Sequence, residues 1–250
     1  MKSILSLYFC LFGLSLLAQD TGSIMYQETI KLDIQMDDMP GVDIKSMLPE
    51  STSFDRVLHF QPGSSLYVVL PTEEPEEKEI SSDDGSFRMV FKMDSDDKEA
   101  FYTDHGKKEM IHQQTFMGKT FAVDMKFPDF KWKVTGEKIK YLDYECMKAT
   151  ATYDEKAVVA WFTPQLPARI GPAHFGQLPG AVLMISVDDG DREYKATSVT
   201  FGELPMEIKA PKEGKKVSEE EFDAIVDEKE KEMMEQMGGD GEGTRIMIRG

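Results

Sequence analysis

Residues 24–36 read IMYQETIKLDIQM, and apolar side chains occupy nearly every second position of this stretch. The face formed by the even-numbered residues is nearly all apolar, and its members are Ile24, Tyr26, Glu28, Ile30, Leu32, Ile34 and Met36. The opposite face is mostly polar. A period of two over this length predicts a long β-strand with one buried face.

Shorter runs of strand character follow, and turn residues such as Pro62-Gly63 and Met117-Gly118-Lys119 separate them. These runs cover residues 54–60, 65–70, 87–93, 101–102, 109–116, 120–125, 132–139, 144–152, 157–162, 181–187 and 193–201. No helical pattern alternates with them. The sequence therefore predicts a mainly β fold, with about ten to twelve strands in a curved antiparallel sheet, either a half-barrel or a sandwich.

The segment 71–86, PTEEPEEKEISSDDGS, offers almost no apolar residue to bury. Its composition predicts a solvated loop, and a cation site is the functional alternative. Near the C-terminus the pattern changes to a helical one over residues 218–237. Ser218 and Glu221 have the spacing of a capping box, and Gly238-Gly239 would end this amphipathic helix.

The first residues, MKSILSLYFCLFGLSLLA, combine a lysine, an apolar run and a small residue at position 18. This pattern predicts a secretory signal peptide and an exported protein, periplasmic or secreted, without a transmembrane segment in the mature chain. The expected organisation is a signal peptide over 1–18, an antiparallel β domain over 19–210, a linker and helix over 211–237, and a Gly-rich tail over 238–250 with a possible short edge strand.

The charge balance argues against nucleic acid as a partner. The chain carries 46 acidic and 29 basic residues, a net charge of −17. A surface of this sign repels a polyanion. Removal of the signal peptide would also remove one of the two cysteines. Cys146 would then be alone, which excludes an intramolecular disulfide.

The densest unusual stretch is residues 161–185, WFTPQLPARIGPAHFGQLPGAVLMI. Its four prolines restrict the backbone, and its three glycines allow turns closed to other residues. Leu178 and other apolar residues are interleaved with them. We expect a rigid crossing that packs onto the sheet.

At this point the sequence resembles the GLPGLI family, exported Bacteroidetes proteins named for a short motif. The matching elements are 144–149 (YECMKA), 160–163 (AWFT), Gly171-Pro172 with Phe175, and 177–182 (QLPGAV). Gln177 stands where the name motif has glycine. The resemblance implies an exported, β-rich protein and no known activity. The candidate structural residues are Tyr144, Cys146, Lys148, Trp161, Gly171, Pro172, Phe175, Leu178, Pro179 and Gly180.

Few residues of the sequence point to catalysis, a reactive group or a metal site. Cys146 is either a reactive thiol, activated by Lys148 two residues away, or a small buried hydrophobe. His174 is the best histidine candidate for a pocket. Met233, Met234 and Met237 would suit Cu(I), and packing is the alternative. No nucleophile elbow, phosphate loop or zinc cluster is present in the sequence.

We therefore expect no catalytic residue, no cofactor site and no metal site. The leading hypothesis is a non-enzymatic envelope protein that binds a hydrophobic ligand or a partner chain on a curved sheet. The alternatives are an assembly partner of an outer-membrane complex, docking through the terminal helix, and a copper-handling protein.

Overall fold

The computed structural model describes residues 20–32, 34–35, 49–70, 76–81, 88–93, 98–166, 168–236 and 245–246. The predicted signal peptide and most of the Gly-rich tail lie outside the described residues.

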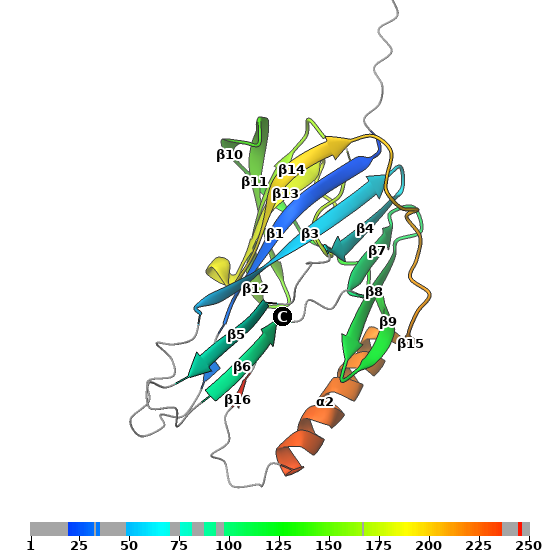
Figure 1. The fold of residues 1–250 in the computed structure, drawn as a ribbon. Helices are drawn as coiled ribbons and strands as arrows, with labels where there is room; N and C mark the ends of the chain where they lie inside the picture. The colour runs from blue at the N-terminus through cyan, green and yellow to red at the C-terminus, as the bar shows by residue number, and fades with distance from the viewer. Residues whose placement is uncertain are drawn as a thin grey trace, which may run out of the picture.

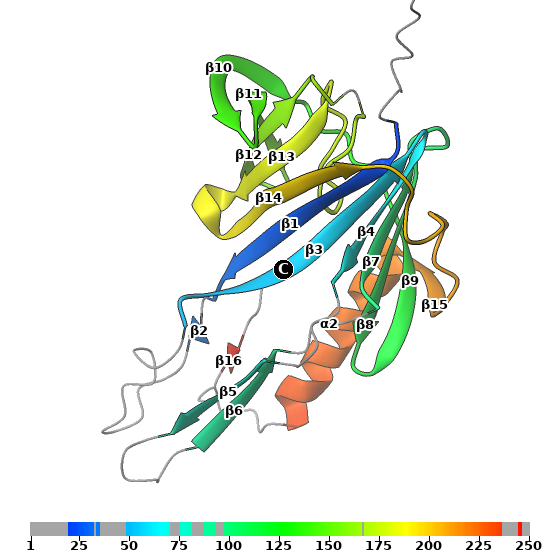
Figure 2. The ribbon, with the colours of Figure 1, turned by 45° about the horizontal axis from the view of Figure 1, so that its top comes forward.

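Twelve of the described strands form one sheet, in the order β10-β11-β12-β13-β14-β1-β3-β4-β7-β8-β9-β15. Their bounds are β1 Gly22–Lys31, β3 Ser51–Gln61, β4 Ser64–Val69, β7 Ala100–Asp104, β8 Glu109–Phe116, β9 Lys119–Met125, β10 Lys133–Tyr141, β11 Tyr144–Tyr153, β12 Lys156–Thr163, β13 Ala181–Val187, β14 Arg192–Phe201 and β15 Lys215–Ser218. The predicted fold class, a mainly β protein with a curved sheet and one C-terminal helix, is confirmed. The twelve strands make one open, curved sheet and not two packed sheets (Figures 1 and 2).

Strand β1 joins the two halves of this sheet. It pairs antiparallel with β14 on one side and with β3 on the other, so that Ile24 lies opposite both Val199 and Leu58. The strand ends at Lys31, earlier than the predicted Met36, because its paired partners begin at Arg192 in β14 and at Ser51 in β3. Just beyond the ladder, the Leu32 amide still donates to the Glu50 carbonyl at 2.9 Å. The short β2, Ile34–Gln35, pairs instead with β16, Arg245–Ile246.

Two predictions of irregular structure are wrong. Residues 76–81 lie in the expected acidic loop, yet they form β5, Glu76–Ser81, which pairs with β6, Arg88–Met93. The register places Glu77 opposite Lys92, and such cross-strand pairing is invisible to composition. Residues 215–218 lie in the expected linker, yet they form β15, which pairs with β9 in parallel.

The terminal helix α2, Glu219–Gln236, begins with the predicted capping box. The Glu221 amide donates to Ser218 Oγ at 3.2 Å, and the Ser218 amide donates to the Glu221 carboxylate at 3.0 Å. Phe222 then packs on Phe121 with ring centroids 5.2 Å apart. Among the described residues, no helix has both the length and the apolar character needed to cross a bilayer.

The register defines one face of the sheet, called here the inner face. Directly paired residues share a face. One such row across eight strands is Val199, Ile24, Leu58, Tyr67, Phe101, His112, Val123 and Val217. At one end of this row Val123 and Val217 contact α2. At the other end the crossing, residues 164–180, adds Leu166, Ile170, Phe175 and Leu178 to the main core. The centre of the inner face lies between these two covers.

Candidate functional site

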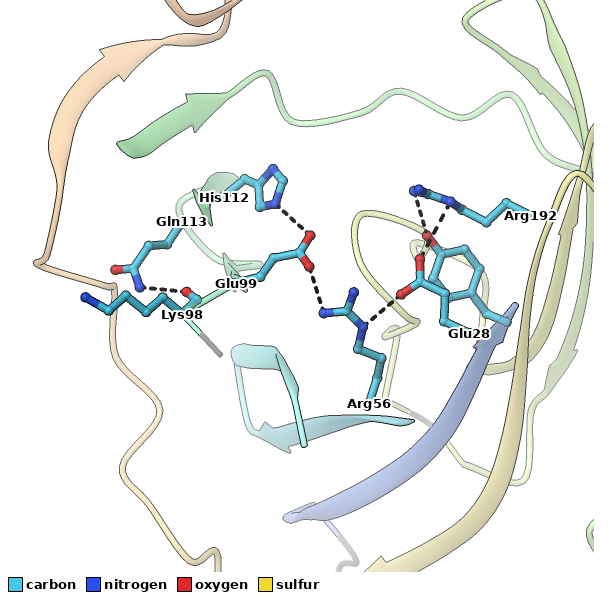
Figure 3. A network of polar contacts seen from close by, with 8 residues as sticks. Glu28, Arg56, Lys98, Glu99, His112, Gln113 and Arg192 are labelled. Atoms are coloured by element: carbon cyan, nitrogen blue, oxygen red, sulfur yellow. Dashed lines mark hydrogen bonds and ion pairs between the residues drawn. The ribbon is translucent and has the colours of Figure 1, made fainter. Parts of the chain in front are cut away.

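Four charged side chains and one histidine gather at the centre of the inner face, and together we call them the charged network: Glu28, Arg56, Glu99, Arg192 and His112. They come from β1, β3, the residue before β7, β8 and β14. Figure 3 shows Arg56 between the two carboxylates, with His112 on the far side of Glu99 and Arg192 beside Glu28. The hypothesis of a hydrophobic ligand assumed an apolar inner face. The charged network shows that the centre of this face is polar.

Arg56 bridges the two carboxylates. Its Nε donates to Glu28 Oε2 at 2.9 Å, and its Nη1 lies 2.8 Å from Glu99 Oε2. The other oxygen of Glu99 lies 3.2 Å from His112 Nε2. The side chains of Arg56 and Glu28 are only 9% and 5% exposed. The charges of Arg56 and Glu28 are thus paired with each other and with neighbouring side chains of the network.

The pKa values follow from this pairing. Burial alone would raise the pKa of Glu99, but the hydrogen bond from His112 and the charge of Arg56 lower it to about 2. Burial opposes the charge on Arg56, but Glu99 and Glu28 raise its pKa above the usual value. Both groups are held in their charged forms, which suits fixed electrostatic contacts and not proton transfer near neutral pH.

Arg192 is less well satisfied than Arg56. Its Nη1 donates to Tyr194 Oη at a long 3.4 Å, and its Nε lies 3.6 Å from Glu28 Oε1, beyond hydrogen-bond distance. Burial disfavours its charge, and the nearby Tyr194, Glu28 and Glu99 raise its pKa nonetheless. Its side chain is 26% exposed and that of Glu99 is 25% exposed, so both face solvent in part.

Three buried side-chain atoms lack a hydrogen-bond partner among the described residues: Arg192 Nε, Tyr67 Oη and His174 Nε2. Tyr67 and Arg192 both approach Tyr194, since the rings of Tyr67 and Tyr194 are 6.3 Å apart. The ring of His174 lies 6.3 Å from that of Phe101, a member of the row that defines the inner face. The unpaired atoms therefore surround the same central part of the inner face, and leaving them unpaired costs free energy.

The histidines are scattered in the sequence, but the structure brings His174 and His105 to the same cavity. His174 lines a cavity of about 10 Å³ beside Ser65, Thr103 and His105. Burial and the charges of His112 and Arg192 lower its pKa to about 3. His59 Nδ1 lies 2.7 Å from Ser23 Oγ. No three His, Cys, Asp or Glu residues within the described part of the chain are placed to hold a metal ion. The side chains of Met233 and Met234, and all of Met237, lie outside the described residues.

Cys146 is fully buried in β11. Burial raises the pKa of its thiol to about 11. Lys148 does not activate it, because the ammonium lies 3.0 Å from the Glu137 carboxylate and 5.9 Å from the ring centre of Trp161. Of the two interpretations of Cys146, the structure supports the buried hydrophobe. Tyr144, half-buried, pairs across the hairpin with Tyr141.

Two glycines of the crossing are required by close approach of the backbone. A Cβ at Gly171 would lie 1.8 Å from the Phe175 carbonyl oxygen, and one at Gly180 would lie 2.1 Å from that of Thr163. Gly180 also has φ of +154°. Pro172 is buried and its carbonyl accepts from the Phe175 amide at 2.9 Å. Phe175 and Leu178 are core residues, whereas Pro179 is exposed.

Gln177 stands where the GLPGLI name motif has glycine, and its backbone conformation is one that glycine adopts easily. Its φ is +69°, a left-handed conformation in which glycine would be favoured. The side-chain amide donates to the Pro128 carbonyl at 2.5 Å, and Arg169 donates to the Gln177 carbonyl at 2.8 Å. These contacts offset the backbone strain, and they tie the crossing to the segment before β10.

Sequence reasoning did not find the charged network, although a signal for it exists. Glu28 and Arg56 each occupy an apolar face of a predicted strand. A charge at such a position needs a partner, because burying it alone is costly. Two opposite charges with the same need are natural partners for each other, so the pair was open to prediction. Glu99 and Arg192 have no comparable signal, because both lie just outside the predicted strands 101–102 and 193–201. His112 lies in the predicted strand 109–116, whose composition is mixed.

Comparison with known proteins adds a family match and a fold. Residues 151–184 match the family described as "Protein of unknown function (Porph_ging)", a segment that contains β12 and the crossing. Two crystal forms of PNGF-II, in space groups P21 and C2, have a similar fold, with TM-scores of 0.53 and identities of 14% and 15%. The likeness covers 83% of this chain but 33% of the PNGF-II chain in the first of them. The search of curated proteins gave no match.

Proposed function

We propose that this protein is an exported, non-enzymatic binding protein, and that its ligand binds at the charged network on the inner face. The observation that carries the proposal is the position of the network: five charged or titratable side chains lie mid-sheet, between the crossing and α2. A buried ion-pair network contributes little net stability, because desolvation offsets the attraction. Local departures from an apolar core are typical of functional sites.

The ionisation states favour binding over catalysis. Glu99 and Arg56 keep their charges, His174 stays neutral, and the Cys146 thiol stays protonated at neutral pH. None of these four groups has a pKa tuned toward neutrality, as a general acid or base would need. The network also makes a polar ligand a better fit than the hydrophobic one expected from the sequence.

Docking of an outer-membrane complex through α2 receives less support. The apolar side chains through which α2 would dock include Phe222 and Ile225, and both pack against β9 and β15. Export is supported by the N-terminal sequence pattern and by the GLPGLI resemblance.

Native mass spectrometry of the protein purified from its own periplasm tests the proposal. We expect a mature chain that begins near Gln19 and carries a non-covalent ligand of low mass. The same protein, unfolded in urea, dialysed and refolded, is the control, and it should have lost the extra mass. Retention of Met1, or a bare chain in both samples and after incubation with periplasmic extract, would contradict the proposal.

A further inference from the structure

We infer that the charged network recognises a neutral amide group, with Arg192 donating to the amide carbonyl and Glu99 accepting from the amide N–H. This inference rests on the proposed function and names the chemical class of the ligand. It concerns the two members of the network whose side chains are partly open to solvent, at 26% and 25% exposure.

Arg192 has hydrogen-bonding capacity left. A guanidinium has five N–H donors. Among the described residues, Arg192 makes one hydrogen bond, of 3.4 Å, and one ion pair, of 3.6 Å, and its Nε has no hydrogen-bond acceptor. Because Nε itself is buried, a ligand carbonyl oxygen would accept from one of the three remaining N–H groups of Nη1 and Nη2, and this would give Arg192 the short hydrogen bond that it lacks.

Glu99 has the complementary capacity. Among the described residues, each of its two oxygens has one protein partner, His112 Nε2 at 3.2 Å and Arg56 Nη1 at 2.8 Å. A carboxylate offers about four lone-pair directions, so about two of them remain. In Figure 3 the side chains of Glu99 and Arg192 extend toward one another, Glu99 from beside His112 and Arg192 from beside Glu28. A donor edge therefore faces an acceptor edge, the pattern that an amide matches.

The charge of the site selects a neutral ligand. The two arginines of the network balance its two glutamates, and His112 adds a positive charge only when it is protonated. An anion bound to Arg192 would lie beside Glu28 and Glu99 in a poorly solvated place, and the whole chain already carries −17. A cation bound to Glu99 would meet Arg56 and Arg192. An amide adds no charge and satisfies both edges.

Acetamide and acetate, nearly equal in shape and different in charge, test the inference in the folded full-length mature protein. Each is titrated at equal ionic strength while NMR follows the Nε–H signal of Arg192 and the backbone amides of β1 and β14. We expect saturable shifts with acetamide and at least tenfold weaker binding of acetate. A blocked dialanine peptide should bind more tightly than acetamide if the amide belongs to a peptide chain, and equally if it belongs to a small molecule.

Variants of β14 complete the test. Arg192→Gln should abolish the acetamide shifts, and Arg192→Lys, which keeps the charge that faces Glu28, should weaken binding at least fivefold. Lys195→Gln removes one positive charge from the same strand at an exposed position and should leave binding unchanged. Stronger binding of acetate, or acetamide shifts that survive in both Arg192 variants, would overturn the inference. A periplasmic ligand seen by mass spectrometry together with either result would leave the proposed binding function standing.

Discussion

At the scale of single residues, the inner face contrasts two tyrosines that are alike in burial and unlike in bonding. Tyr26 is 1% exposed and its hydroxyl donates to the Val182 carbonyl at 2.5 Å. Tyr67 is 2% exposed and its hydroxyl has no partner among the described residues. The two rings lie 6.0 Å apart, so the packing around them is shared. The hydroxyl of Tyr67 is a cost to the fold that its position near the charged network explains better than stability does.

This contrast predicts that replacing each tyrosine with phenylalanine will affect the free energy of unfolding differently at the two positions. Tyr26→Phe should lower the free energy of unfolding by about 1–2 kcal/mol, because it breaks a buried hydrogen bond. Tyr67→Phe should leave it unchanged or raise it by up to about 1 kcal/mol, because it removes an unpaired polar group. Urea titrations of both variants measure the difference. An equal loss of stability in both would show that the Tyr67 hydroxyl is bonded in solution.

His174 predicts how stability depends on pH. Its pKa is lowered to about 3 by burial and by His112 and Arg192, from 6.5 in an unfolded chain. Between these two pH values the unfolded chain binds a proton that the folded protein does not, so stability falls as the pH falls. The loss amounts to about 1.4 kcal/mol per pH unit, or about 2 kcal/mol from pH 6.5 to pH 5.

His174→Gln isolates this contribution, because the variant has no titrating group at that position. Its free energy of unfolding should fall by about 2 kcal/mol less than that of the natural protein between pH 6.5 and pH 5. This window stays above the range in which Glu99 titrates. Equal losses in the two proteins would mean that His174 is solvated and titrates normally.

At the scale of elements, strands were predicted well where the alternation or β-propensity of their own residues indicated them. Residues 109–116 and 181–187 were predicted with the bounds of β8 and β13. β15 could not be predicted, because Lys-Lys-Val-Ser has almost no pattern and its partner β9 lies about a hundred residues earlier in the sequence. β5 was missed for a related reason, since only its pairing with β6 makes its glutamates part of a strand. Long-range pairing is what the sequence alone does not reveal.

The crossing is the element whose role the sequence did indicate, and its glycines test that role. Gly171→Ala should lower the free energy of unfolding by at least about 2 kcal/mol, because the methyl group would meet the Phe175 carbonyl. Gly176→Ala is the matched control, since its nearest contact would be 3.4 Å from the Arg169 carbonyl oxygen. It should change stability by less than about 0.5 kcal/mol. Denaturant titrations in which the two variants behave alike would contradict the structural role of the crossing.

At the scale of the whole molecule, one continuous sheet carries separate hydrophobic cores. The main core gathers residues of β1, β3, β4 and β10–β14 together with the crossing. A separate, small cluster of Phe121, Val123 and Val217 holds α2 and the parallel edge strand β15 against β9. The charged network lies between the two. Free energies of opening should therefore differ across the sheet, with the edge at β15 opening without the centre.

Hydrogen exchange measures this difference directly. Amides of residues 215–232 should exchange through a local opening that urea barely affects, whereas those of 22–31 and 181–187 should exchange only through global unfolding. Phe222→Ala should weaken the small cluster by roughly 2 kcal/mol, since the ring is half-buried, and so speed exchange of residues 215–232 about thirtyfold. The same variant should leave residues 181–187 nearly unchanged. Phe175→Ala, in the main core, is the control that should speed exchange at 22–31 and 181–187. A single rate of opening for all these segments, shifted together by Phe222→Ala, would show instead that α2, β15 and the main core unfold as one unit, with the charged network inside a single rigid body.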